Sequence, residues 1–185
     1  LKKYGSEIVK NERIVVHDSH DDAALVHLGT LPSGGEMILS RLAVETDLLV
    51  AEGFIEPHFF AGFSGGRKSV LPGVASYKTV MANHCAEFIA HDRARTGILG
   101  GNPIHADMVF AARTTGLAFV CNVVIDSEKH IVAAFSGDME AAHEKGCEFV
   151  GRYGRVEAVP ADIVITSNAG YPLDQNLYQI GRAHV

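Results

Sequence analysis

The chain has 185 residues, of which 47% are hydrophobic and 21% are charged, and its formal net charge is −6. This composition is typical of a globular protein with a buried core. The acidic balance disfavours nucleic acid as a partner, and no apolar run is long enough to predict a membrane-spanning helix. Three scattered cysteines without a Cys-x-x-Cys pair predict neither a disulfide framework nor a zinc ribbon, so we expect a reducing, cytoplasmic location.

The first part of the chain predicts short strands and one helix before a glycine-rich loop. We expect strands at residues 13–17, 24–28 and 47–51, the last of them buried, and an amphipathic helix at residues 36–44. The third strand ends near Gly53, so the loop at residues 58–73 follows its carboxyl end. Ligands usually bind at that edge of an α/β sheet.

The second part of the chain predicts further helices and strands. Ser76 is expected to cap a helix that runs to about residue 91 and carries His84 on one face. Strands at residues 117–125 and 130–135 and a helix at 139–153 follow. A linker at 154–160 and a strand at 161–166 place a domain boundary near Val156.

The alternation of strands and helices predicts a layered α/β architecture. We interpret residues 1–155 as a Rossmann-like domain that lacks its upstream part, and residues 156–179 as the start of a second α/β domain. Residues 180–185, IGRAHV, are interpreted as a non-native tail and are excluded from fold reasoning.

The stretch EPHFFAGFSGGRKSVLPG, at residues 56–73, combines a histidine, four glycines and an Arg-Lys pair. Glycines such as Gly65 and Gly66 permit positive φ and a close approach of the backbone to a ligand. His58 can exchange a proton, and Lys68 can act as a cation or a nucleophile. The stretch therefore predicts a cofactor or anion cradle.

A Walker A interpretation of this stretch fails, because Arg67 stands where the motif needs its second glycine. Arg67, Lys68 and the glycine amides can still hold a phosphate of another kind. A solvated basic turn is the alternative, and His58 and His84, each taken alone, are more simply explained as structural histidines.

Four segments considered together resemble the nickel-dependent lactate racemase family: HFFAGFSGGRKSVLPG, Asn83-His84, GNP at residues 101–103 and YPLDQNLYQ at residues 171–179. The resemblance covers nearly the whole chain. Its spacing is specific, with ten residues from His58 to Lys68 and sixteen from Lys68 to His84.

The resemblance implies a nickel-pincer nucleotide, a modified nicotinate mononucleotide whose two sulfurs and one ring carbon grip the metal. Lys68 corresponds to the lysine that bonds this cofactor through a thioamide, and His84 to the histidine that completes the nickel coordination. Square-planar nickel accepts such sulfur and imidazole ligands. Arg67 is expected to lower the pKa of the neighbouring Lys68. The further implied cofactor contacts are Arg67, Gly65, Gly66, Phe60, Tyr178 and Gln179.

The resemblance also implies a racemase or epimerase of a lactate-like 2-hydroxy acid. His58 corresponds to one of two catalytic histidines, which take the hydroxyl proton while hydride moves to the cofactor. The intermediate is a planar 2-keto acid, and hydride returned to either face gives both enantiomers.

The second histidine and a carboxylate-binding arginine belong to motifs upstream of Leu1, so we expect this fragment to be inactive alone. The implied partners are the small-molecule substrate and the enzymes that make the cofactor. The alternative is a non-catalytic nucleotide- or phosphate-binding module that uses the same glycine-rich loop without nickel.

Overall fold

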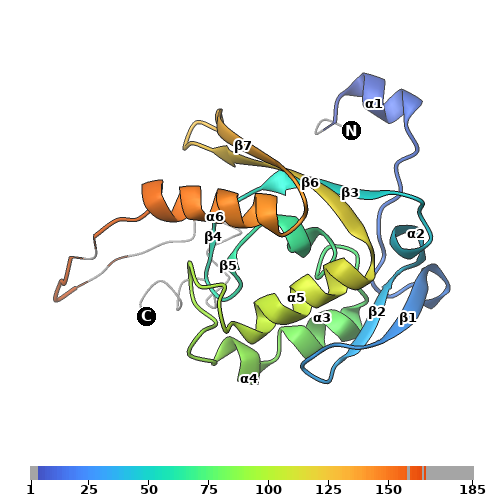
Figure 1. Ribbon diagram of the computed structural model, residues 1–185, viewed down its shortest axis with the longest axis horizontal. Coiled ribbons are helices and arrows are strands. Elements are labelled where there is room, and N and C mark those ends of the chain that lie inside the picture. The colour runs from blue at the N-terminus through green and yellow to red at the C-terminus, as the bar shows by residue number, and fades with distance from the viewer. Residues whose placement is uncertain (1–3, 158, 164, 166–185) are drawn as a thin grey trace.

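The computed structural model describes residues 4–157, 159–163 and 165. Its α-helices are α1 (Ser6–Asn11), α2 (Arg41–Val44), α3 (Tyr77–Asn83), α4 (Ala86–Ile89), α5 (Pro103–Thr114) and α6 (Ala141–Tyr153), and its 3₁₀ turns are η1 (Asp22–Ala24) and η2 (Gly66–Ser69). Its strands are β1 (Leu25–Thr30), β2 (Glu36–Ser40), β3 (Leu49–Phe54), β4 (Pro57–His58), β5 (Gly62–Phe63), β6 (Leu117–Ile125) and β7 (Ile131–Gly137). Figure 1 shows that α1 projects from the body of the molecule at the end of an extended segment.

The central sheet has the strand order β3-β6-β7. Strands β3 and β6 are parallel, and β6 and β7 form an antiparallel hairpin. The chain between β3 and β6 crosses over through β4, β5, η2 and the helices α3 to α5, which lie below the sheet in Figure 1, while α6 lies along β6 and β7. The predicted α/β class is confirmed, and the glycine-rich loop begins directly after the carboxyl end of β3.

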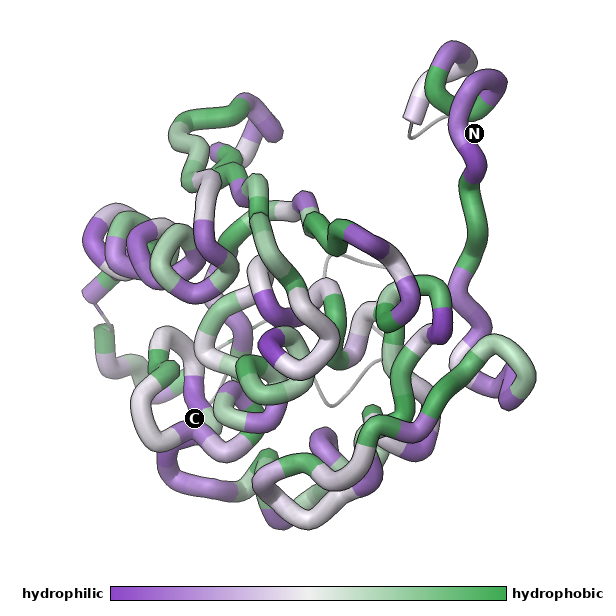
Figure 2. Tube along the Cα trace, turned by 45° about the vertical axis from the view of Figure 1, so that its right-hand side comes forward, coloured by the Kyte–Doolittle hydropathy of each residue, from purple (hydrophilic) through white to green (hydrophobic). Residues whose placement is uncertain are grey.

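The elements predicted near the end of the described chain are also found. β6 matches the predicted strand at residues 117–125, β7 covers most of 130–135, and α6 begins two residues after the predicted start at 139. Figure 2 shows hydrophilic and hydrophobic residues alternating along α6, whose buried positions include His143, Cys147 and Val150. An amphipathic helix on a sheet is a pattern that local sequence specifies well.

The prediction of a helix at residues 36–44 is wrong for the first five of these residues. Residues Glu36–Ser40 form β2, which pairs antiparallel with β1, and only the four-residue α2 follows. Met37 and Leu39 are buried at 1% and 0% exposure, so the side chains alternate with the period of a strand. This short apolar run fits the helical and the strand periods equally, and pairing with β1 makes it a strand.

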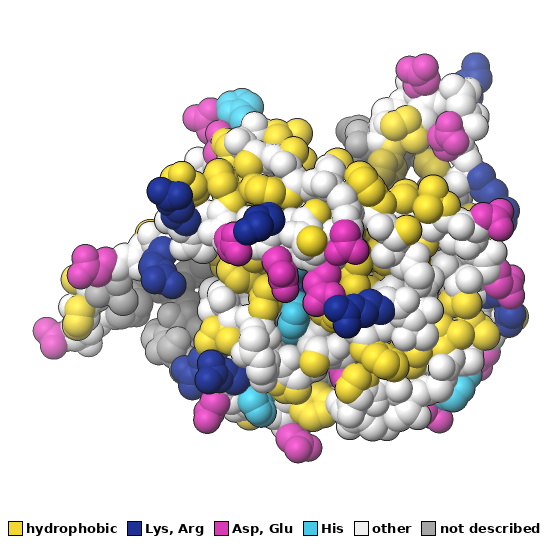
Figure 3. Space-filling model, viewed as in Figure 1, with side chains coloured by type: hydrophobic (Ala, Val, Ile, Leu, Met, Phe, Trp, Pro, Cys, Tyr) yellow, Lys and Arg dark blue, Asp and Glu magenta, His cyan; other side chains and the backbone are white. Residues whose placement is uncertain are grey.

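The strand expected at residues 13–17 is not formed, because its backbone pairs with no segment of the described chain. β3 is found at Leu49–Phe54, two to three residues later than predicted, and it is not buried as expected: one face is half-buried. Val50 and Phe54 are 56% and 45% exposed on the other face, and Figure 3 shows apolar side chains at the surface along β3 and over the β6–β7 hairpin.

The helix expected from Ser76 to residue 91 begins as predicted but ends early. The Ser76 side chain caps α3 by accepting the Thr79 N–H, and α3 ends at Asn83, before the short α4. The sequence analysis missed α5 altogether. Its signals were present, since Asn102 caps the helix by accepting the Ile104 and His105 N–H groups and Pro103 occupies the first turn.

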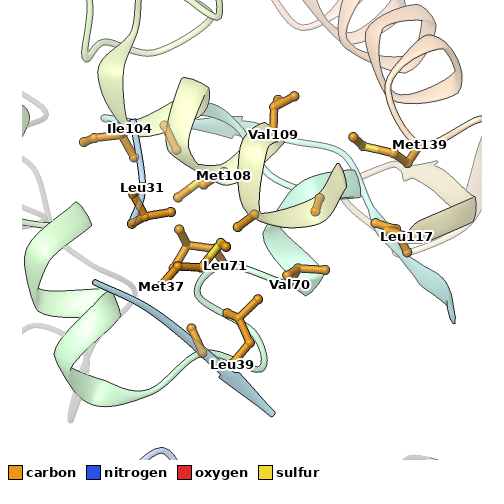
Figure 4. Close-up of a cluster of buried hydrophobic side chains, with 14 of the residues drawn as sticks. Leu31, Met37, Leu39, Val70, Leu71, Ile104, Met108, Val109, Leu117 and Met139 are labelled. Carbon is orange, nitrogen blue, oxygen red and sulfur yellow. The ribbon is translucent and has the colours of Figure 1, made fainter. Parts of the chain in front are cut away.

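The main core lies between β2, α5 and the segment that follows η2. Figure 4 shows Ile104 and Met108 of α5 facing Met37 and Leu71. Burying each such side chain contributes roughly 1.5–3 kcal/mol. Because Leu71 lies two residues after η2, this packing fixes the glycine-rich loop against α5.

The strand predicted at residues 161–166 falls partly outside the described residues, at positions 164 and 166. Residues 161–163 and 165 form no strand. Within the described part of the chain, no helix combines the length and the apolar character needed to cross a membrane.

Two glycines of α6 provide a matched test of how α6 packs on the sheet. A Cβ at Gly146 would lie 2.2 Å from Ile55 Cδ1 and 3.2 Å from the Phe135 ring, whereas at Gly151 the nearest atom is 4.0 Å away. We expect Gly146→Ala to lower the free energy of unfolding by about 1–3 kcal/mol through overpacking.

Gly151→Ala is the control, and it should raise the free energy of unfolding by up to ~1 kcal/mol through helix propensity. Urea denaturation of the full-length protein measures both changes. Equal stabilisation by the two substitutions would contradict the packing of α6 described above.

Candidate functional site

The glycine-rich loop folds into a small hairpin followed by a 3₁₀ turn. β4 ends at His58, which pairs with Gly62 in β5, and η2 carries Lys68. This fold brings the two side chains together, with Lys68 Nζ 3.3 Å from His58 Nε2. His58 Nδ1 is turned toward the backbone and accepts the Ala61 N–H at 3.2 Å. Nε2 is therefore the nitrogen that His58 presents to the site.

Phe60 joins His84 to this pair, although His84 comes from a different element. The Phe60 ring lies edge-on to His58 at 4.6 Å and edge-on to His84 at 4.9 Å, between ring centroids. Lys68 Nζ lies 5.9 Å from the centre of the same ring. The structure thus places His58, Lys68 and His84 around the buried Phe60 side chain.

Burial shifts all three groups toward their neutral forms. It lowers the pKa of His58 to about 3, with the charges of Lys68, His84 and Arg67 adding to the effect. It also lowers the pKa of His84 to about 4, with a further contribution from Lys68. The pKa of Lys68 falls to about 8, first through burial and then through the charge of Arg67, as the sequence predicted in part.

These shifts determine what the cluster can do near neutral pH. Both imidazoles are uncharged, so each has a nitrogen lone pair for a proton or a metal. Because Ala61 donates to His58 Nδ1, the neutral ring carries its own proton on Nε2. That N–H can donate to Lys68 Nζ only when the amine is neutral, a form that is the minority at pH 7 and reaches half near pH 8. A neutral amine is the form of lysine that acts as a nucleophile.

Arg67 does not line the loop surface as the phosphate-binding interpretation requires. Its side chain is 1% exposed, and its nitrogens donate to protein acceptors. These acceptors are Gly65 O at 3.2 Å, Ala61 O at 2.9 Å, His105 Nδ1 at 3.0 Å and His143 Nε2 at 2.9 Å. The guanidinium is consequently a structural cation that holds the loop against α5 and α6.

The glycines at 65 and 66 are also needed for a reason other than the predicted one. Both have positive φ, at 78° and 54°. A Cβ at Gly66 would lie 2.8 Å from the His143 ring, and one at Gly65 would lie 3.0 Å from Phe54 O. The close approach that these glycines permit is therefore to the protein interior, and the Gly66 N–H donates to Asn122 Oδ1 at 3.0 Å.

The sequence analysis missed His105, His143 and Asn122, which support the loop from α5, α6 and β6. Burial lowers the pKa of His105 to about 4 and that of His143 to about 3, and in both cases the Arg67 charge contributes. Both rings are neutral, and His105 Nδ1 can accept from Arg67. His143 Nε2 lies 2.9 Å from both Arg67 Nη1 and Ser64 O, so this nitrogen either accepts from Arg67 or donates to Ser64 O. No local pattern marks these residues, because their partner lies far away in the sequence. Tyr178 and Gln179, two other predicted contacts, lie outside the described residues.

Comparison with known proteins assigns the chain to a family. Residues 1–97 match the lactate racemase N-terminal domain, and residues 156–184 match the lactate racemase C-terminal domain. The chain belongs to the lactate racemase family.

Similar proteins support the same assignment. The chain is 63% identical to a lactate racemase of Thermoanaerobacterium thermosaccharolyticum and 62% identical to one of Lactiplantibacillus plantarum. These alignments cover 96% and 97% of this chain but 42% of each relative. The chain therefore spans about two fifths of the length of the lactate racemases that it matches.

Two solved structures are similar to the structure of this chain. The lactate racemase apoprotein from T. thermosaccharolyticum matches with a TM-score of 0.90 and 63% identity, over 96% of this chain and 43% of that one. A crystal structure of a Thermotoga maritima protein matches with a TM-score of 0.64 and 26% identity, over 77% of this chain and 40% of that one.

The lactate racemase family implies nickel, and the residues around Phe60 fit a metal that brings most of its own ligands. The described residues contain no group of three His, Cys, Asp or Glu side chains arranged for a metal ion. They do offer the neutral imidazole of His84, whose buried Nδ1 has no hydrogen-bond partner in the described part of the chain. A single imidazole beside a nucleophilic amine suits a tethered cofactor that carries the remaining ligands.

The lowered pKa of Lys68 gives a direct test of this site. In apo full-length protein, reductive methylation of Lys68 should reach half its maximal rate near pH 8, because the neutral amine is the reactive form. Peptide mass spectrometry across a pH series measures this rate. A midpoint near the ordinary lysine pKa of about 10.4 would contradict the burial of the amine.

The structural role of Arg67 is tested by Arg67→Lys. Lysine has no fork of donors, so several of the four acceptors lose their hydrogen bond, at a cost of about 1–3 kcal/mol each. We expect a lower free energy of unfolding by urea denaturation. Arg113→Lys is the control, since the Arg113 side chain is 64% exposed, and it should change little. An unchanged free energy of unfolding in Arg67→Lys would contradict the structural role of Arg67.

Proposed function

We propose that the full-length protein containing this chain racemises a 2-hydroxy acid such as lactate, using nickel in a nickel-pincer nucleotide. The observation that carries the proposal is the cluster of one readily deprotonated lysine and two neutral histidines around Phe60, in a chain 63% identical to a lactate racemase. The further partners proposed are the enzymes that make the cofactor.

Lys68 and His84 are the residues proposed to hold the cofactor. The neutral amine of Lys68 is a competent acyl acceptor and forms the amide-like tether. The neutral imidazole of His84 supplies one nitrogen ligand to nickel. When bound, the cofactor supplies the hydride acceptor that the protein's own side chains lack.

His58 is proposed to move the proton of the substrate hydroxyl at Nε2. To accept that proton, the ring must carry its own on Nδ1, and the contact from the Ala61 N–H must open. Losing one such hydrogen bond costs about 0.5–1.5 kcal/mol, which is small beside the catalytic effect of a positioned base. Once Lys68 is tethered, its amine no longer competes for Nε2.

The geometry of Arg67 lends little support to the non-catalytic phosphate-binding alternative. It relied on Arg67 as an anion ligand, and the guanidinium donors of Arg67 are directed at backbone oxygens and histidine nitrogens. A measurable affinity of apo protein for AMP or inorganic phosphate, without nickel and without racemisation, would favour this alternative.

Two substitutions separate the proposed roles in full-length protein produced together with the cofactor-making enzymes. His58→Asn should lower kcat for lactate racemisation by about 10²–10⁴-fold, because the proton acceptor is lost, while the lysine adduct remains. Lys68→Arg should abolish the adduct itself. Chiral chromatography measures racemisation, and intact-protein mass spectrometry measures the adduct.

His130→Gln is the control for these variants, since His130 lies in the β6–β7 turn with its side chain 70% exposed. It should racemise lactate at the wild-type rate. Full turnover in His58→Asn would exclude His58 from proton transfer, and a normal adduct mass in Lys68→Arg would exclude the tether.

A further inference from the structure

Asp107 of α5 is a buried carboxylate with hydrogen bonds on two sides. Asp107 is 1% exposed. On one side, Oδ1 accepts the Ser33 N–H at 3.1 Å and Oδ2 accepts the Ser33 hydroxyl at 2.6 Å. On the other side, Oδ2 accepts from Asn83 Nδ2 at 3.1 Å. No step proposed above uses this carboxylate.

Asn83 is the last residue of α3 and is fully buried, with 0% exposure. Its amide donates to Asp107 and also to Ile104 O at 3.3 Å, so both bonds run to α5. The next residue, His84, leaves the helical conformation with φ −97° and ψ 31°. Helix α3 thus ends at Asn83, the residue whose side chain is bonded to α5. The sequence pattern alone predicts that the helix continues to about residue 91.

Few contacts of the His84 ring itself fix its direction, and one of them is an interaction with the backbone of Val80, one turn earlier in α3. Its Nδ1 is buried without a hydrogen-bond partner among the described residues, and its ring contact is the edge-to-face packing with Phe60. A metal-bound histidine usually has its second nitrogen held by a hydrogen bond that sets the ring orientation. Here the ring interacts with Val80 of α3 and packs on Phe60, so its orientation depends on where the backbone leaves α3.

We propose that Asp107 and Asn83 are positioning residues for His84: the bond between them ends α3 at Asn83 and so directs the His84 imidazole toward Phe60 and Lys68. The link to nickel rests on the proposed function. The effect on the orientation of the His84 ring does not.

The two sides of Asp107 allow a matched pair of variants. Asn83→Ala removes the bond on the His84 side, and Ser33→Ala removes the short bond to the Ser33 hydroxyl on the opposite side. Each loses a hydrogen bond to the same carboxylate, so both should lower the melting temperature. Only Asn83→Ala should change His84.

The first measurement uses full-length apo protein and does not depend on the cofactor. In imidazole-region NMR spectra, the His84 ring signals should shift or broaden in Asn83→Ala and remain as in wild type in Ser33→Ala. Unchanged His84 signals in folded Asn83→Ala would overturn the proposal, whatever the cofactor does. If Asn83→Ala does not fold, Asn83→Leu provides the same test, because it is close in size to asparagine and removes only the bonds that the Asn83 amide donates.

The second measurement uses full-length protein loaded with cofactor. Nickel per protein, by mass spectrometry of the metal, should fall about 10-fold or more in Asn83→Ala while the Lys68 adduct persists. Ser33→Ala should keep both. Equal nickel loss in the two variants would reduce Asp107 to a purely structural residue. A wild-type protein with neither nickel nor adduct would refute the proposed function instead, and the apo spectra would still decide the positioning role.

Discussion

The buried Arg67 guanidinium is the constraint on which the rest of the site depends. It ties the glycine-rich loop to itself through Ala61 O and Gly65 O, and to α5 and α6 through His105 and His143. Burying a cation costs free energy unless its donors are satisfied, and here neutral acceptors satisfy them without a carboxylate. The loop is therefore held rigidly, and a fixed positive charge lies next to Lys68.

Burial, reinforced by neighbouring positive charges, gives the cluster its chemical character. Burial is the largest cause of the lowered pKa values of His58, Lys68 and His84, and neighbouring positive charges add to it. No Asp or Glu side chain contributes to these shifts. An acidic neighbour would hold lysine and histidine in their charged forms. Without one, the same residues are available as a nucleophile, a metal ligand and a proton acceptor. The buried Phe60 ring lies beside all three side chains.

Local signals in the sequence predicted the parts of the fold that local interactions determine. The cap at Ser76, the amphipathic α6 and the position of the loop after β3 follow from residues close together in the chain. The signals for α5 were of the same kind and were overlooked. The β2 strand was predicted as a helix because its apolar run is too short to distinguish the two periods without its partner β1.

Other features depend on contacts between distant residues, which no local pattern reveals. Two of the four acceptors of Arg67 lie 38 and 76 residues away in the sequence, so its burial was unforeseen and it was expected to face a ligand. The end of α3 depends in the same way on a bond from Asn83 to a residue 24 positions later. The positions of the candidate site residues were nevertheless predictable, because the family resemblance supplied the spacing that periodicity could not.

Anomalous X-ray diffraction at the nickel edge, from crystals of the full-length, cofactor-loaded protein, tests the central claim most directly. The account predicts one nickel peak within bonding distance of a His84 ring nitrogen, with electron density continuous from Lys68 Nζ into the cofactor. A nickel peak remote from His84, or a free Lys68 amine in active protein, would contradict it.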